Sequence, residues 1–138
     1  MIKLSKMTDY AVVLLVCMAR QERVLLSASA LSQQTNLPEP TVAKLLKIAS
    51  KAGLVSSHRG AQGGYRLDRA IEDIRITEVI EAVDGPIALT TCLESTGEEC
   101  AIQGCCQMNG RWAPVNAAIK SALQDVTLAN MIQKARPA

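Results

Sequence analysis

Aromatic side chains are scarce in this chain of 138 residues: they make up 2% of it, and phenylalanine is absent. Proteins that bind single-stranded nucleic acid stack the bases on aromatic side chains, so this class of function is disfavoured. Histidine occurs once, as His58, and the sequence contains no Ser–His–Asp grouping and no pair of catalytic acids. We therefore expect that the chain is not an enzyme and has no small-molecule substrate.

The sequence also lacks a long hydrophobic run. The apolar stretch at residues 10–19 is too short to span a bilayer and has no signal-peptide cleavage site beside it. We interpret it as a core helix that begins near Thr8–Asp9, in a cytoplasmic protein that makes no contact with membranes. In that compartment disulfides are rare, and clustered cysteines bind metals or sense redox state.

Most of the cysteines lie in one short segment. Four of the five fall within fifteen residues: Cys92, Cys100, Cys105 and Cys106. Gly97 and Gly104 lie between them and allow the backbone to bend tightly. Thiolates gathered on such a loop suit a soft metal centre, either zinc or an iron–sulfur cluster. The paired CxxC spacing of structural zinc sites is absent, which favours iron and sulfur.

Charge is distributed unevenly along the chain. Residues 1–69 contain ten Lys and Arg against four Asp and Glu, whereas residues 70–138 contain five basic and nine acidic side chains. A basic half beside an acidic half indicates that the first half binds a polyanion.

Residues 27–53 are typical of two helices joined by a short turn. The second helix is expected to begin near Glu39, with a proline in its first turn, and to end at Gly53. Apolar residues recur there at three- and four-residue steps, which predicts a buried face of Val42, Leu45, Leu46 and Ala49. The other face is small, polar and basic. This pattern indicates a helix-turn-helix that binds double-stranded DNA.

A glycine-rich hairpin is expected after these helices. Residues 54–58 and 65–67 have the composition of strands, and the segment RGAQGG connects them. Such a hairpin is typical of the wing of a winged helix. It lacks the GxGxxG and GK[ST] patterns of nucleotide-binding loops. Residues 24–26 are also expected to form a brief strand.

The expected contacts with DNA divide into two sets. The exposed start of the second helix is placed to contact base edges in the major groove, through Glu39, Pro40, Thr41 and Lys44. The remaining residues are placed to hold phosphates, which fixes register and affinity without reading sequence: Ser27, Ser29, Lys47, His58, Arg59 and Tyr65.

A second narrow apolar seam follows the cysteines. Residues 112–126 repeat Trp112, Val115, Ile119 and Leu123 at three- and four-residue steps, which fits pairing with a second copy of the helix or packing on the same domain. We expect a homodimer of mainly α fold: a winged helix-turn-helix with a small β-hairpin wing and a long C-terminal dimerisation helix. The expected domains are a DNA-binding domain at residues 1–85, a cysteine-rich loop at 86–110, and a dimerisation helix with a tail at 111–138.

These motifs, in this order, resemble a known family. The segments LSKMTDYAV, GLVSSHRGAQGGYRL, ITEVIEAVDGP and the cysteine loop are similar to those of IscR-type regulators, the Rrf family of winged-helix proteins that bind an iron–sulfur cluster. The ending GCCQMNGRW is most similar to the branch that regulates SUF iron–sulfur assembly operons. The resemblance extends to about residue 132.

The resemblance implies that Cys92, Cys100 and Cys106 ligate a cluster, 2Fe–2S by analogy with IscR or else 4Fe–4S. The family pattern has a histidine three residues after its last cysteine, where this chain has Asn109, a poor iron ligand. In a nitric-oxide-sensing relative, an aspartate from the partner subunit completes the site, and Asp9 falls at that position. The fourth ligand is therefore open between Asp9 of the partner chain, the additional thiol Cys105, and Asn109, water or another group.

The expected function is that of a transcriptional regulator and redox sensor, which reads iron–sulfur cluster status and controls SUF-type assembly genes. The alternatives are a nitric-oxide or redox-responsive repressor of the same family, a zinc-binding winged-helix regulator, and a cluster-free thiol sensor that switches through a disulfide.

Overall fold

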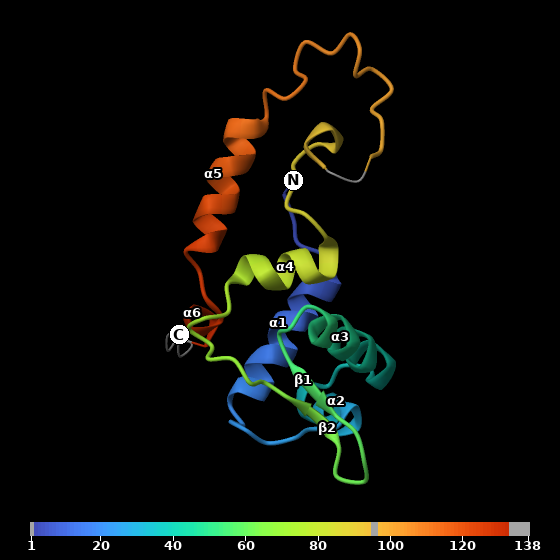
Figure 1. Cartoon of the computed structure of the whole chain (residues 1–138), viewed down its shortest axis with the longest axis vertical. Coiled ribbons are helices and arrows are strands. Elements are labelled where there is room, and N and C mark those ends of the chain that lie inside the picture. The colour runs from blue at the N-terminus through green and yellow to red at the C-terminus, as the bar shows by residue number, and fades with distance from the viewer. Residues whose placement is uncertain (1, 95–96, 133–138) are drawn as a thin grey trace.

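The computed structural model describes residues 2–94 and 97–132 of the chain. In this part the chain is mostly helical, with one two-stranded antiparallel hairpin, as the sequence predicts (Figure 1). The elements, in chain order, are α1 (Lys6–Ala19), α2 (Ala28–Thr35), α3 (Glu39–Lys51), β1 (Ser56–His58), β2 (Gly64–Arg66), α4 (Ile76–Asp84), the short 3-10 helix η1 (Thr91–Leu93), α5 (Ala113–Gln124) and α6 (Leu128–Met131).

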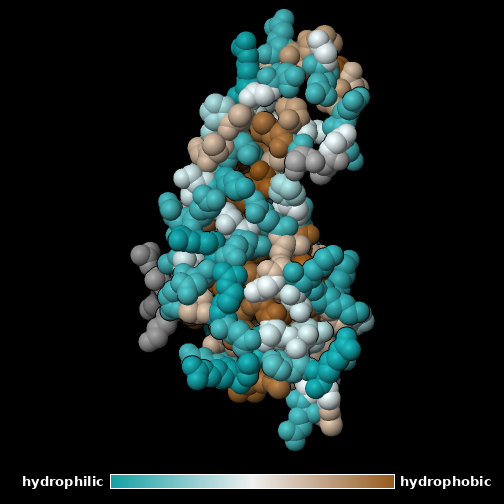
Figure 2. Space-filling view, in the orientation of Figure 1, coloured by the Kyte–Doolittle hydropathy of each residue, from teal (hydrophilic) through white to brown (hydrophobic). Residues whose placement is uncertain are grey.

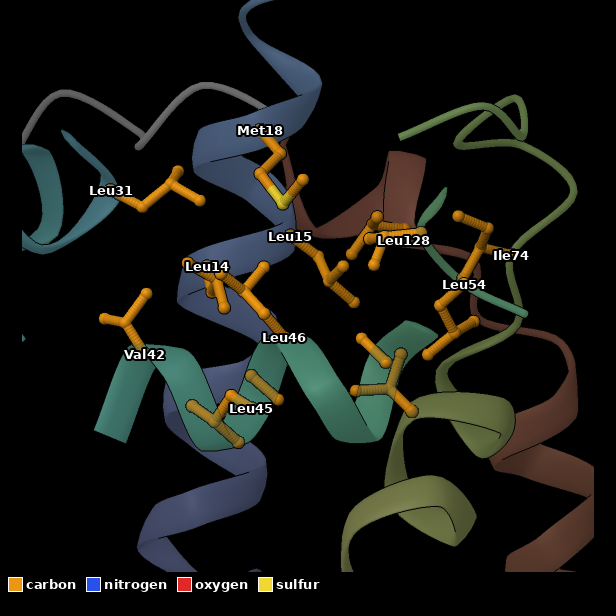
Figure 3. Close-up of a cluster of buried hydrophobic side chains, with 14 of the residues drawn as sticks. Leu14, Leu15, Met18, Leu31, Val42, Leu45, Leu46, Leu54, Ile74 and Leu128 are labelled. Carbon is orange, nitrogen blue, oxygen red and sulfur yellow. The ribbon is translucent and has the colours of Figure 1, made fainter. Parts of the chain in front are cut away.

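Helix α1 lies at the centre of the hydrophobic core and contacts α2, α3, α4 and α6. Its sequence is apolar on nearly all sides, so neighbouring helices can pack on several of its faces. Figure 3 shows Leu14 and Leu15 of α1 among side chains from the surrounding elements. The predicted buried face of α3 is confirmed, since its members are at most 7% exposed: Val42, Leu45, Leu46 and Ala49.

Helix α1 begins at Lys6, earlier than expected, because Ser5 rather than Thr8 caps it. The Ser5 Oγ accepts a hydrogen bond from the backbone N–H of Thr8 at 3.1 Å. Thr8 itself is buried, and its hydroxyl donates to Asp84 Oδ2, at the end of α4, over 2.7 Å. Ser5 Oγ also donates to Asp84 Oδ1 over 2.7 Å. This cluster fixes the start of α1 on the last turn of α4.

The wing is a short hairpin that is held to the body at one point. The strand expected at residues 24–26 is reduced to a single bridge, in which the Leu26 N–H donates to the Tyr65 carbonyl over 2.9 Å and the Tyr65 N–H donates to the Leu26 carbonyl over 2.8 Å. Gly64 permits this approach, because a Cβ there would lie 2.8 Å from the Leu26 carbonyl oxygen.

Helix α5 contains twelve residues and is somewhat shorter than the 112–126 segment expected to be helical. None of its residues is buried, and it lies beside α4 rather than inside the core (Figure 1). Polar groups hold it there. Lys120 Nζ lies 2.9 Å from Glu81 Oε1 of α4, and the Arg75 guanidinium donates to the Gln124 carbonyl over 2.8 Å.

After α5 the chain returns to the core, which the sequence does not predict. Leu128 of α6 is 0% exposed and lies among Leu15, Leu54 and Ile74 (Figure 3). Its backbone N–H donates to the Ile74 carbonyl over 2.8 Å. Helix α6 therefore closes the core that residues 1–85 build. Residues 133–138, the rest of the expected C-terminal tail, lie outside the described part.

Candidate functional site

The outward face of α3 presents the residues expected to contact base edges. Glu39, Pro40 and Lys44 are exposed, and Thr41 is partly exposed. Pro40 stands in the first turn, where its missing N–H removes no helical hydrogen bond. No side chain caps this end of the helix. The exposed first turn of α3 is therefore open to contact by a ligand.

The residues expected to hold phosphates lie on α2, on α3 and on the wing. Ser27 Oγ accepts from the backbone N–H of Ala30 over 3.0 Å, which leaves the hydroxyl proton free to donate to a phosphate. Ser29 and Lys47 are exposed. His58 and Arg59 are exposed on the wing, and the His58 Nε2 lies 3.3 Å from Ser56 Oγ.

Tyr65 differs from the rest of this set. It is half-buried, packs against the core, and its backbone is used in the bridge to Leu26. The wing glycines also have a steric role inside the hairpin, because a Cβ on Gly63 would collide with the carbonyl oxygen of His58. The structure therefore gives Tyr65 and Gly63 a part in shaping the wing, apart from any contact with DNA.

The described residues of the cysteine loop, 86–94 and 97–110, extend to the opposite end of the molecule from the wing (Figure 1). Cys92 is in η1, and Cys100 and Cys106 follow in a series of turns. All three residues line one cavity of about 320 Å³, whose other lining residues are Thr90, Thr91, Gln103, Met108, Asn109 and Trp112. The fold thus brings around one cavity the three cysteines that the family resemblance implies as ligands.

Polar neighbours act on the Cys92 thiol. A hydrogen bond with the Thr90 hydroxyl, whose oxygen lies 3.1 Å from Sγ, and a second from the backbone N–H of Gly110 lower the pKa of Cys92 below its ordinary value. A lowered pKa favours the thiolate, which is the form that binds metals. Residues near both ends of the loop, Thr90 and Gly110, therefore lower the pKa of this thiol.

The candidates for a fourth ligand are placed differently. Cys105 is exposed and does not line the cavity, and its thiol donates to the Ile102 carbonyl over 3.5 Å. Asp9 is exposed in the first turn of α1, and it too is absent from the described lining. Asn109 does line the cavity. One protomer thus places three of the expected ligands around the cavity, and the fourth ligand is still open.

The chemistry of the cavity suits a soft metal centre, because three cysteines are among the residues that line it. Among the described residues, however, no three His, Cys, Asp or Glu side chains are close enough to hold one metal ion. Turns occupy residues 101–105 and 107–110 of the loop, and Gly97 and Gly110 have φ values of 78° and 72°. The donor set therefore fits the group, and the loop has to contract for the sulfurs to share it.

Two sets of residues near the loop are missed by sequence reasoning. The first is the cluster of Ser5, Thr8 and Asp84 described above. The second is Asn116 of α5, whose side-chain amide bonds to the backbone of Leu89 and Ile87 at 2.9 and 3.1 Å. Both sets join residues far apart in the chain, so no local pattern of composition or spacing signals them.

None of the helices in the part of the chain that the structure describes is long and apolar enough to cross a membrane.

A profile of the Rrf2 family, described as an iron-dependent transcriptional regulator, matches residues 4–134. The HTH-type transcriptional regulator IscR of Cereibacter sphaeroides is 30% identical over 135 residues, which are 95% of this chain and 87% of that protein.

Solved structures agree in fold. CymR, the global cysteine regulator of B. subtilis, is 28% identical and superposes with a TM-score of 0.73, over 99% of this chain and 100% of that one. IscR of T. potens is 28% identical with a TM-score of 0.66, over 99% of this chain and 94% of that one. The winged-helix fold and the non-enzymatic, DNA-binding class expected from the sequence are therefore confirmed. The chain belongs to the Rrf2 family of transcriptional regulators.

Proposed function

We propose that this regulator is a homodimer whose affinity for its operator depends on an iron–sulfur cluster held by Cys92, Cys100 and Cys106. The observation that carries the proposal is that these three residues line one cavity. Similarity to two proteins named IscR supports the class of cofactor. We take 2Fe–2S as the first choice and 4Fe–4S as the alternative, and SUF-type assembly genes as the targets.

The surface of α5 supports dimerisation. Val115 is 44% exposed, and Ala118 and Ala122, which follow it at helical spacing, are exposed too. Trp112 is 42% exposed at the start of the same helix. Figure 2 shows hydrophobic side chains at the surface near the cysteine loop. A contiguous apolar surface of this kind is typical of an interface. In the dimer, Asp9 of the partner subunit is one candidate to complete the ligand set, and Cys105 is another.

The DNA-binding surface supports a two-fold operator that is read by one α3 helix per major groove. Glu39 would accept from a cytosine amino group, and Thr41 would contact a base edge or a thymine methyl group. The phosphate contacts would come from the α2 start, Lys47 and the wing. If the protein neutralises about six phosphates, a plot of the logarithm of the DNA-binding constant against the logarithm of the salt concentration should have a slope of about −5.

The cysteine loop would couple cluster binding to operator affinity. A bound cluster would supply a redox-active centre that is lost under oxidation, iron shortage or nitric oxide. If Cys92, Cys100 and Cys106 held a common centre, their sulfurs would lie closer together and the conformational freedom of the loop would fall. A tenfold change in operator affinity needs only about 1.4 kcal/mol of coupling, which is within the range of such ordering.

The test is anaerobic purification, followed by an absorption spectrum and counts of iron and sulfide per protomer. Wild-type protein is expected to be brown and to absorb above about 400 nm, as an iron–sulfur protein should. The single variants Cys92→Ala, Cys100→Ala and Cys106→Ala are expected to lose iron. Cys17→Ser is the matched control, because Cys17 lies in α1 and its thiol bonds to Gln34, away from the loop.

Two results would contradict the proposal. Colourless wild-type protein that carries zinc would favour a structural metal site. Metal-free protein in which oxidation alone changes operator affinity would favour a disulfide switch. Within the proposal, Asp9→Ala and Cys105→Ala separate the candidates for the fourth ligand, because only the variant of the true ligand changes the spectrum and the rate of cluster loss.

A further inference from the structure

The side chain of Asn116 forms hydrogen bonds through both ends of its amide with the backbone at the start of the cysteine loop. Its Oδ1 accepts from the Leu89 N–H over 2.9 Å, and its Nδ2 donates to the Ile87 carbonyl over 3.1 Å. Both distances are those of ordinary hydrogen bonds. Between described residues, these are the only hydrogen bonds that the backbone of residues 86–89 makes. One side chain therefore fixes this segment.

The position of Asn116 connects the two ends of the loop. Thr90, which directly follows Leu89, lines the cavity at the entrance to the loop, and Trp112 lines it at the exit. The backbone N–H of Asn116 bonds to the Trp112 carbonyl over 2.9 Å in the first turn of α5. Asn116 thus ties the backbone just before Thr90 to the helix that begins just after Trp112.

The face of α5 that carries Asn116 is itself held to the body of the protein. Residues 116, 120 and 124 are four apart and lie on one side of the helix. Lys120 bonds to Glu81 of α4, and the Gln124 carbonyl accepts from Arg75 just before α4. The amide of Asn116 therefore holds the loop entrance against an anchored support.

We propose that Asn116 is a positioning residue for the metal centre: its amide holds the entrance of the loop beside the start of α5, so that Cys92 faces the cavity that Cys100 and Cys106 also line. This inference rests on the proposed function, since it gives the amide a role in cluster binding. Asn116 bonds to no thiol of the loop. It acts through the backbone of residues 87–89, which sets the place of Thr90 and Cys92.

The test compares Asn116→Ala, which loses both hydrogen bonds, with Asn116→Asp, which keeps an acceptor for Leu89 but loses the donor to Ile87. Ser121→Ala is the control, because Ser121 is exposed on the same helix and no side-chain hydrogen bond of it is present in the described part. Hydrogen exchange of the Leu89 amide in the metal-free protein measures the contact itself. The decay of absorption above about 400 nm in air, after anaerobic loading, measures the lifetime of the cluster.

We expect the Leu89 amide to exchange faster in Asn116→Ala and to remain protected in Asn116→Asp. Loss of two neutral hydrogen bonds predicts cluster decay about tenfold faster in Asn116→Ala, with Asn116→Asp between it and the wild type. Ser121→Ala should match the wild type in both measurements. Circular dichroism checks that each variant is folded, and the near-isosteric Asn116→Asp keeps the test open should the alanine variant unfold.

Failure of the positioning role and failure of the proposed function give different results. If wild-type protein binds iron and Asn116→Ala loses it at the wild-type rate, the positioning role is wrong and the proposed function stands. If wild-type protein binds no iron, the proposed function fails first and the positioning role fails with it. Equal Leu89 exchange in wild type and Asn116→Ala would overturn the hydrogen bond on which the inference depends.

Discussion

Replacing Leu128 with alanine tests whether the C-terminal helix α6 contributes to the hydrophobic core. Leu128 is 0% exposed and packs in the cluster that contains Leu15, Leu54 and Ile74. All three neighbours are at most 2% exposed, so the site has little room to collapse around a smaller side chain. We therefore expect the destabilisation to lie in the upper half of the usual range of about 2–5 kcal/mol for Leu→Ala.

The expected change is large against the stability of a typical domain, about 5–15 kcal/mol. The unfolding entropy of a chain of 138 residues converts each kcal/mol into about 3 °C. Leu128→Ala should therefore lower the melting temperature of the metal-free protein by about 10 °C or more. Urea denaturation followed by circular dichroism, at a fixed protein concentration, should show a lower midpoint with an unchanged slope.

The control is Met131→Ala on the same short helix. Met131 is 49% exposed, so its truncation should change the stability by less than about 0.5 kcal/mol. Leu128→Met conserves most of the volume and should recover most of the loss. Equal stability of Leu128→Ala and Met131→Ala would refute the reasoning, because it would mean that α6 contributes nothing to the core in solution.

Three further predictions follow from other parts of the molecule. Although burial opposes ionisation, hydrogen bonds from Thr8 and Ser5 outweigh it and lower the pKa of Asp84, so its contribution to stability is present above the unfolded pKa and is lost as pH falls through the folded pKa. The stability difference between wild type and Asp84→Asn, from urea curves, should shrink toward acid pH, and a constant difference would contradict this. Lys47→Ala should weaken binding to all DNA sequences and make the slope of log binding constant against log salt shallower by about 1. Glu39→Ala should leave that slope unchanged and should reduce discrimination at one base pair by about 1–3 kcal/mol, as measured by competition binding. Val115→Asp should shift the protein toward monomer in sedimentation, and Ala117→Asp, exposed on another face of α5, should not.

The parts of the fold that the sequence predicts well are those with local signals. The buried face of α3 follows from apolar residues at three- and four-residue steps. Gly53 follows the C-cap residue Ala52 and has a φ of 75°, as expected for a glycine that ends a helix. The start of α1 is less predictable, because Ser5 and Thr8 are both suitable caps. Only Asp84, far away in the chain, decides that Thr8 is buried instead.

The brief strand expected at residues 24–26 fails for a similar reason. Composition favours it, but of residues 24–26 only Leu26 forms a β-bridge, with Tyr65 in strand β2 of the wing. Leu128 has no helical periodicity around it, because α6 is only four residues long. The sequence therefore gives no sign that this leucine enters a core built by residues more than forty positions earlier.

Part of the candidate site can likewise be predicted from the sequence, and part of it cannot. The clustering of cysteines is visible in the sequence, and the resemblance to IscR-type proteins selects Cys92, Cys100 and Cys106, which the structure places around one cavity. Spacing alone does not distinguish Cys105 from Cys106, and the turn that directs Cys105 outward makes the distinction. The role of Asn116 depends on the path of the backbone at residues 87–89, which no local pattern encodes.

The polar attachment of α5 has a consequence for how the protein can respond to a signal. Its contacts with the α4 region include one exposed ion pair and one hydrogen bond to a carbonyl, and no side chain of α5 is buried. Exposed ion pairs contribute about 0–1 kcal/mol and single hydrogen bonds about 0.5–1.5 kcal/mol. Contacts of this size keep α5 beside α4, and a ligand needs only a few kcal/mol of differential affinity to change the position of the helix.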